Sequence, residues 1–165
     1  MNHSFNFLTV AKSTLADRID IRTSTFSKVS GNVLELNVET DDLGMYNAEY
    51  VSIVDSSFED IGEAVTDLYR GGTDESTFGP HFELRGSTLE NVGHSKRNRS
   101  GASVRLLGVQ RAYVNNNMFA NSKGLRVEQT VGDPVTVIRS NTFRATPAPE
   151  ILNGEAQLSD NVLVE

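Results

Sequence analysis

The sequence of 165 residues contains no cysteine. This absence excludes disulfides, thiolate metal sites and a cysteine nucleophile. Long hydrophobic runs are missing as well, because none approaches the roughly 20 apolar residues that a membrane-spanning helix needs. Residues 1–8 have no basic stretch leading into a sustained apolar run, so we expect no signal peptide within them, although a cleaved one could precede them. We therefore expect no membrane partner.

Helical periodicity is almost absent along the chain, whereas β-branched residues are frequent throughout. With 38% hydrophobic and 22% charged residues, the composition is that of a globular protein. The length suffices for one domain with a real core and is short for two. We expect a single all-β domain over residues 1–165.

Charge is distributed unevenly along the sequence. Residues 1–80 hold five basic and fourteen acidic residues, whereas residues 81–144 hold ten basic and four acidic ones. A basic band inside a chain of net charge −7 could meet a polyanion, although an uneven solvated surface explains it equally well. The overall acidity, without interleaved basic and aromatic residues, argues against a nucleic-acid partner.

A short phrase recurs six times: apolar, any, apolar, two small or polar residues, Ser or Asn, any, and Phe or Leu. The copies cover residues 19–26, 51–58, 82–89, 112–119, 136–143 and 156–163. Their last residues lie 32, 31, 30, 24 and 20 positions apart. An unequal period of this size fits a solenoid whose coils share strands but differ in the lengths of their turns.

Each copy of the phrase has the properties of one corner of a β-helix. Alternating apolar residues direct one strand face inward, and the Ser or Asn then marks a sharp turn. The turn residues would stack one above the next and bond to the neighbouring coil; this ladder comprises Ser24, Ser56, Ser87, Asn117, Asn141 and Asn161. The sequence thus predicts a right-handed parallel β-helix of about six coils, with a leucine-rich repeat or a β-sandwich as alternatives.

A second inward strand is expected after a glycine in each coil, at Gly31, Gly62, Gly101 and Gly124. Glycine suits a bend that requires positive φ. Residues 60–68 also match helical spacing weakly, but the repeat predicts strand there. The stretch from Phe5 to Leu15 is expected to form an incomplete first coil.

One stretch is more specific than the repeat: Tyr-Arg-Gly-Gly-Thr-Asp-Glu-Ser-Thr-Phe-Gly-Pro at residues 69–80, followed by residues 82–93. It resembles the second β-helix domain of two-domain alginate lyases, which belong to polysaccharide lyase family six together with chondroitinase B. The resemblance covers roughly residues 11–165. It implies action on uronate polysaccharide by β-elimination, an extracellular or periplasmic location, and a preceding catalytic β-helix domain or second protomer as partner.

In that family a Lys base, an Arg and a calcium ion held partly by a Glu-x-Glu pair perform the chemistry, all in the first domain. This sequence contains no Glu-x-Glu, and none of its four lysines lies in a comparable context. No catalytic residue can be carried over, and we expect no cofactor in this chain. The resemblance therefore implies the C-terminal half of a larger lyase, without independent catalysis.

The residues themselves suggest weaker site candidates. Arg and Lys side chains could bind a saccharide carboxylate. These candidate substrate contacts are Arg70, Lys96, Arg97, Arg99, Arg105 and Arg111. If the chain were itself a compact lyase, the neutralising and proton-transfer roles would fall to Arg70, His81, Lys96 and Arg105.

Each of these candidates also has a structural interpretation. Asp74 and Glu75 are a weak calcium signal, because they lack the oxygen spacing of a dedicated loop. Arg70 could equally hold the glycine-rich loop through an ion pair with Asp74, and His81 beside Gly-Pro could be a hydrogen-bonded structural residue. The segment 94–101 could be a solvated loop. Without tryptophan, no strong stacking platform for sugars is evident, and a non-catalytic uronate-binding solenoid remains a third possibility.

Overall fold

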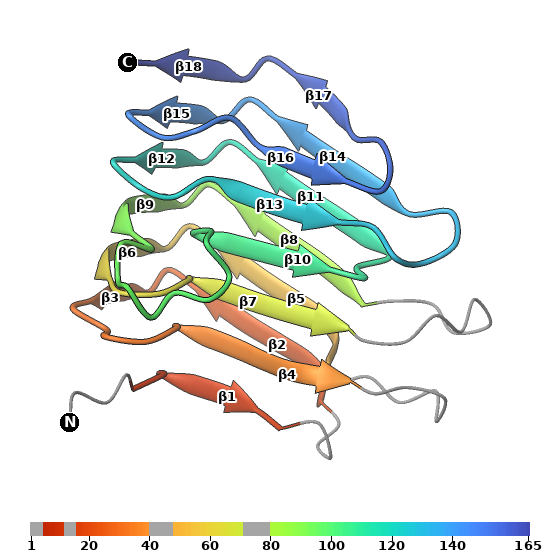
Figure 1. Cartoon of the computed structure of the whole chain (residues 1–165), viewed down its shortest axis with the longest axis horizontal. Coiled ribbons are helices and arrows are strands. Elements are labelled where there is room, and N and C mark those ends of the chain that lie inside the picture. The colour runs from red at the N-terminus through yellow and green to blue at the C-terminus, as the bar shows by residue number, and fades with distance from the viewer. Residues whose placement is uncertain (1–4, 12–15, 40–47, 71–79) are drawn as a thin grey trace.

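The computed structural model describes residues 5–11, 16–39, 48–70 and 80–165. All regular structure in these ranges is β-strand, arranged in three parallel sheets of six strands each (Figure 1). The predicted parallel β-helix is thereby confirmed. None of the described residues forms a helix of the length and apolarity that crossing a membrane requires.

The three sheets take one strand each from every coil. Sheet A is formed by β1 (Leu8–Val10), β4 (Leu34–Glu39), β7 (Thr66–Arg70), β10 (Val104–Leu107), β13 (Leu125–Glu128) and β16 (Glu150–Leu152). Sheet B is formed by β2 (Ala16–Arg22), β5 (Ala48–Val54), β8 (His81–Arg85), β11 (Arg111–Asn115), β14 (Val135–Arg139) and β17 (Gln157–Ser159). Sheet C is formed by β3 (Thr25–Ser27), β6 (Ser57–Ile61), β9 (Thr88–Val92), β12 (Met118–Ala120), β15 (Thr142–Arg144) and β18 (Val162–Val164).

Every coil runs through sheets A, B and C in that order, so each strand pairs with the strand three places along the chain. The recurring phrase spans the strand in sheet B, a sharp turn, and the strand in sheet C. The glycine-led segments precede β4, β7, β10 and β13 of sheet A, where inward strands were expected. Residues 60–68 contain the end of β6 and the start of β7, so the repeat predicted this region correctly and the helical spacing did not.

The core consists of the inward residues of the three sheets, which stack in register from coil to coil. Phe58, Phe119 and Phe143 of sheet C are fully buried. The rings of Phe119 and Phe143 lie 4.9 Å apart and nearly parallel, at 15°. Phe26 stacks on Phe58 in the same way, at 5.4 Å and 4°. The last position of each phrase therefore builds one aromatic and aliphatic column through the core.

The Ser and Asn side chains at the turn between sheets B and C form a continuous hydrogen-bonded column. The Ser56 amide donates to the Ser87 hydroxyl, and the Ser87 amide donates to Asn117 Oδ1. The Asn117 amide donates to Asn141 Oδ1, and the Asn141 amide donates to Asn161 Oδ1. Each coil therefore satisfies the turn backbone of the coil before it.

The glycines before sheet A are not all explained by positive φ, which corrects the expectation from the sequence. Only Gly101 has it, with φ of 66°. At Gly31 a Cβ atom would lie 2.9 Å from the Phe5 carbonyl oxygen, and at Gly62 it would collide with the Ser30 carbonyl oxygen. At Gly31 and Gly62 the backbone of the preceding coil passes too close for any side chain.

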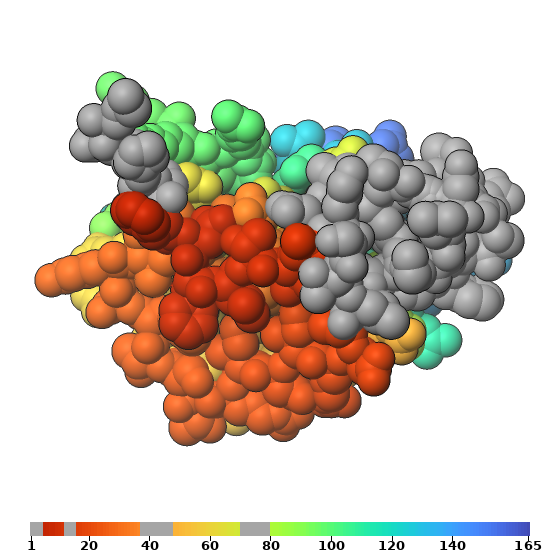
Figure 2. Space-filling view, turned by 90° about the horizontal axis from the view of Figure 1, so that it is seen from below, coloured from red at the N-terminus to blue at the C-terminus, as the bar shows by residue number. Residues whose placement is uncertain are grey.

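The two ends of the stack differ from its middle in exposure. Figure 2 looks onto the first coils, whose atoms are red and orange. Phe5 and Phe7 are 71% and 63% exposed at this end, and Leu163 is 62% exposed in the last coil. The best-buried side chains accordingly belong to the coils between them.

Candidate functional site

The outer face of sheet A carries a column of polar side chains, most of them charged. Strand register aligns Thr9, Glu35, Asp67, Arg105, Arg126 and Glu150, one from each coil. Alternation places the neighbours of these residues, such as Leu34 and Leu106, in the core. Of these residues, Glu35, Asp67, Arg105 and Arg126 are half-buried charged groups, whereas Thr9 and Glu150 at the two ends of the column are exposed.

Two ion pairs order this column. Arg105 Nη1 lies 3.4 Å from Asp67 Oδ1, and Arg126 Nε lies 3.5 Å from Glu150 Oε2. Burial raises the pKa of the Asp67 carboxyl above its usual 3.8, with Glu63 acting in the same direction, although Arg105 opposes the shift. The Glu35 carboxylate accepts a hydrogen bond of 2.7 Å from Asn6 Nδ2.

Arg105 and Arg126 are direct neighbours on β10 and β13. Like charges directly opposite each other destabilise a pair of strands. The Nε atoms of both side chains are buried and lack a hydrogen-bond partner within the described ranges. The Tyr69 ring faces the Arg105 guanidinium at 5.2 Å and offsets part of this repulsion.

A basic loop, residues 93–103, connects β9 to β10 and extends over the earlier coils in front of sheet A (Figure 1). The Ser95 amide donates to the carbonyl of Gly62, one coil below. Asn98 Nδ2 donates to the carbonyls of Gly93 and Ala102, at 2.8 and 3.0 Å, and so closes the base of the loop. Its Oδ1 accepts from Ser100 Oγ and from the Gly101 amide. The loop is therefore held in one shape by its own polar groups.

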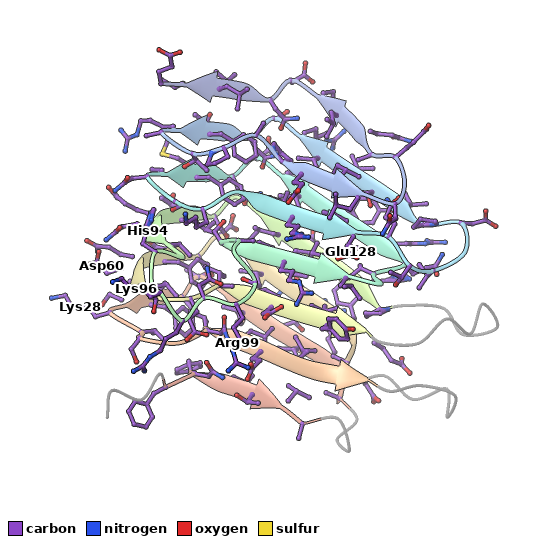
Figure 3. All side chains as sticks on the ribbon, in the orientation of Figure 1. Lys28, Asp60, His94, Lys96, Arg99 and Glu128 are labelled. Carbon is purple, nitrogen blue, oxygen red and sulfur yellow. The ribbon has the colours of Figure 1, made fainter. Side chains whose placement is uncertain are left out.

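A groove of about 590 Å³ lies between this loop and sheet A. Its lining includes three carboxylates, three cations and three amides: Glu35, Glu63, Asp67, Lys96, Arg97, Arg99, Asn6, Asn32 and Asn98. Figure 3 shows Arg99 in front of β4 and β7, with Lys96 nearer the end of the loop that follows β9. We call this cavity the loop groove.

Lys96 and Arg99 of the loop groove do not pair with its carboxylates within the described residues. In the described part of the chain no ion pair joins Lys96 or Arg99 to an acid, and Asp67 pairs with Arg105 instead. Asn32 Nδ2 donates to Glu63 at 3.2 Å. The described ranges contain no group of three or more His, Asp and Glu side chains that could hold a metal ion.

The remaining sequence candidates lie elsewhere. His81 and Arg111 are register neighbours on the outer face of sheet B. Burial, with Arg111 contributing, lowers the pKa of His81. The side chain of Arg70 and residues Asp74 and Glu75 lie outside the described residues. The structure thus gathers Lys96, Arg97 and Arg99 at one groove beside Arg105 and separates Arg111 and His81 from them.

Sequence reasoning did not identify the carboxylate floor of the loop groove. Glu35 and Asp67 occupy the same outward position in successive glycine-led strands as Arg105 does. Aligning those strands on their buried leucines, Leu36, Leu68 and Leu106, would have revealed the column. Asn98 carried no signal, because its role depends on the closed shape of the loop.

Comparison with solved structures identified a close relationship. Over 91% of its length this chain matches the structure of the PL6 family alginate lyase AlyGC, with 42% sequence identity and a TM-score of 0.85. An arginine-to-alanine variant of that enzyme matches over the same share, with 40% identity and a TM-score of 0.86. The resemblance to polysaccharide lyase family six is thereby confirmed.

The match occupies only 22% of the AlyGC chain. No family model matches the sequence, and no curated protein matches it either.

Proposed function

We propose, from the similarity to an alginate lyase of family six, that this chain is a β-helix domain that binds uronate polysaccharide and does not cleave it alone. The observation that carries the proposal is the basic loop, which presents Lys96, Arg97 and Arg99 to a groove on sheet A. Cations on a shaped polar surface suit a polymer with a carboxylate on every sugar unit.

The separation of the catalytic candidates supports a binding role. β-Elimination needs a base for the C5 proton, a group that neutralises the adjacent carboxylate, and an acid for the leaving oxygen. His81 lies on sheet B, whereas Lys96 and Arg105 belong to the sheet A side. Arg105 is already engaged by Asp67, so it would have to leave that carboxylate to neutralise a substrate.

The same similarity suggests the setting of the domain. The chain spans 22% of the length of AlyGC, so a larger lyase with a separate catalytic β-helix domain is the context that we propose. This chain would form part of the C-terminal domain of that lyase and would contact the catalytic domain or a second protomer. The same proposal implies that the protein is located outside the cytoplasm, where it would encounter alginate.

Two measurements on the same sample test the proposal. Eliminated uronates acquire a conjugated double bond that absorbs in the near ultraviolet, and bound ones do not. We expect a flat absorbance trace with alginate and calcium at neutral pH, together with retarded migration of the chain in an alginate-containing native gel. We expect the retardation to decrease as salt is added, because salt screens the attraction between the exposed cations and the carboxylates of the polymer.

A rise in absorbance would contradict the non-catalytic assignment, and Lys96 and Arg105 would then be the candidate catalytic residues. Unretarded migration with a flat trace would contradict binding and leave a packing or dimerisation role. A neutral glucan gel serves as the matched control.

A further inference from the structure

We propose that the loop groove is a discrete site for a short uronate segment, in which Lys96 and Arg99 bind a sugar carboxylate while Glu35 and Glu63 accept hydrogen bonds from sugar hydroxyls. The inference rests on the proposed function and specifies where on sheet A the polymer is recognised. It concerns residues of this chain alone.

The charges of the groove are arranged for a ligand that has both kinds of polar group. Lys96 and Arg99 on the loop and Glu35, Glu63 and Asp67 on the sheet side line the same cavity of about 590 Å³. Within the described residues Lys96 and Arg99 form no ion pair with these acids, so both cationic groups are available to a ligand. A ligand with donors and acceptors can bridge the two sides.

The loop is held in place by hydrogen bonds. Asn98 closes the loop through two backbone carbonyls and two further acceptor bonds. Ser95 fixes its other arm to the coil below through the Gly62 carbonyl. Lys96 and Arg99 are exposed on this braced loop, so less ordering entropy is lost when they bind than on an unbraced one.

The combination of groups selects one class of ligand. A densely charged sulfated glycan would be repelled by Glu35, Glu63 and the neighbouring Asp67. A neutral sugar has no anionic group with which Lys96 and Arg99 could pair. A uronate has one carboxylate and several hydroxyls per unit, which matches both sides. The volume falls within the range of small-molecule sites, about 300–1,000 Å³, and suits a short oligosaccharide.

Titration calorimetry of the whole chain with trimannuronate and triguluronate tests the site. We expect Lys96→Ala/Arg99→Ala to weaken binding of the preferred trimer by at least about tenfold, as expected for lost charged hydrogen bonds. The control variant Lys28→Ala/Arg144→Ala removes the same net charge from exposed positions at sheet C and should bind within about twofold of the parent. Figure 3 shows Lys28 pointing away from the groove.

A second variant tests the carboxylate side. Glu35→Gln/Glu63→Gln keeps acceptor oxygens but removes two charges, so we expect affinity for a sulfated trisaccharide to rise relative to the uronate trimer. Thermal unfolding of each variant verifies that the fold is retained. An unchanged ratio of the two affinities would overturn the role of the carboxylates.

The outcomes separate this inference from the proposed function. If the parent binds alginate and the trimers while Lys96→Ala/Arg99→Ala binds equally well, the groove assignment is wrong and the proposed function stands. Equal weakening by both double variants would indicate unspecific charge attraction and would also overturn the groove. If the parent binds neither alginate nor trimers, the proposed function itself fails.

Discussion

At the scale of single residues, glycine serves two separate purposes in this chain. Gly86 and Gly101 have positive φ, at 62° and 66°, which suits a residue without Cβ. Gly62 has ordinary φ but lies against the Ser30 carbonyl of the preceding coil. The first purpose can be inferred from a turn motif, whereas the second depends on how closely two coils approach.

Replacing Gly62 with alanine tests the second purpose. A Cβ would collide with backbone, which yields less readily than a flexible side chain, so we expect Gly62→Ala to lower the free energy of unfolding by about 1–3 kcal/mol. Gly132 is the control, because a Cβ there would meet nothing within 4 Å. Urea denaturation should place Gly132→Ala within about 1 kcal/mol of the parent. Equal midpoints for both variants would refute the crowding argument.

Asp67 gives a pH-dependent prediction. Burial raises the pKa of Asp67 in the folded state above its value in the unfolded chain. Its contribution to the free energy of unfolding is therefore fully present at pH values below the unfolded-state pKa and is lost as the pH rises through the folded-state pKa. Asp67→Asn has no carboxyl to ionise, so the variant does not lose this stability as the pH rises. We therefore expect the stability of the variant, relative to the parent, to be more favourable at pH 7 than at pH 3.

Asp20 supplies the opposite control. Hydrogen bonding to Arg18 lowers the pKa of Asp20, so its contribution is present at neutral pH and is lost on acidification. Asp20→Asn should therefore become relatively less stable as the pH rises from 3 to 7. Denaturant titrations at both pH values compare the two variants, and slopes of the same sign would contradict the assignment.

At the scale of elements, the turn between sheets B and C is the best-defined part of each coil. Asn117 is 3% exposed and donates from Nδ2 to the Leu84 carbonyl and to Asn141 Oδ1, both at 2.9 Å. The Ser87 amide donates to its Oδ1. One buried side chain thus satisfies backbone groups of the coil below and continues the column to the coil above.

Asn117→Ala would leave the Ser87 amide and the Leu84 carbonyl without these partners. Because unsatisfied buried polar groups each cost about 1–3 kcal/mol, we expect a loss of about 2–4 kcal/mol in the free energy of unfolding. Serine occupies the same turn position at Ser56 and Ser87, so Asn117→Ser should lose less than the alanine variant. Chemical denaturation provides the measurement, and equal losses for both variants would exclude the hydrogen-bond explanation.

The elements also show how far sequence reasoning reaches. The strands of sheets B and C follow from the phrase, because the turn between them has a constant length and alternation determines which residues face inward. The column on sheet A is harder to infer, because loops of different lengths precede its strands and obscure which outward residues align. The groove beneath the basic loop depends further on Asn98 and on the contact of Ser95 with Gly62, which no local pattern encodes.

At the scale of the whole molecule, the uneven charge of the sequence acquires a spatial meaning. Acidic residues of the early coils, such as Glu35 and Asp67, lie on the same face as the basic loop that extends down from the third coil. The sequence indicated two blocks of opposite charge, one after the other. The coiling brings them face to face, because positions about 30 residues apart become neighbours.

The near-constant register also separates what the molecule can vary from what it must keep. Successive phrases lie between 32 and 20 residues apart, yet the columns of sheets B and C pass through every coil without a shift. Residues can therefore be gained or lost at a corner without changing the core. Such a scaffold can evolve through the loops at its corners. A loop such as 93–103 can be lengthened, shortened or exchanged as a unit, so that binding specificity changes while the stacked coils remain the same.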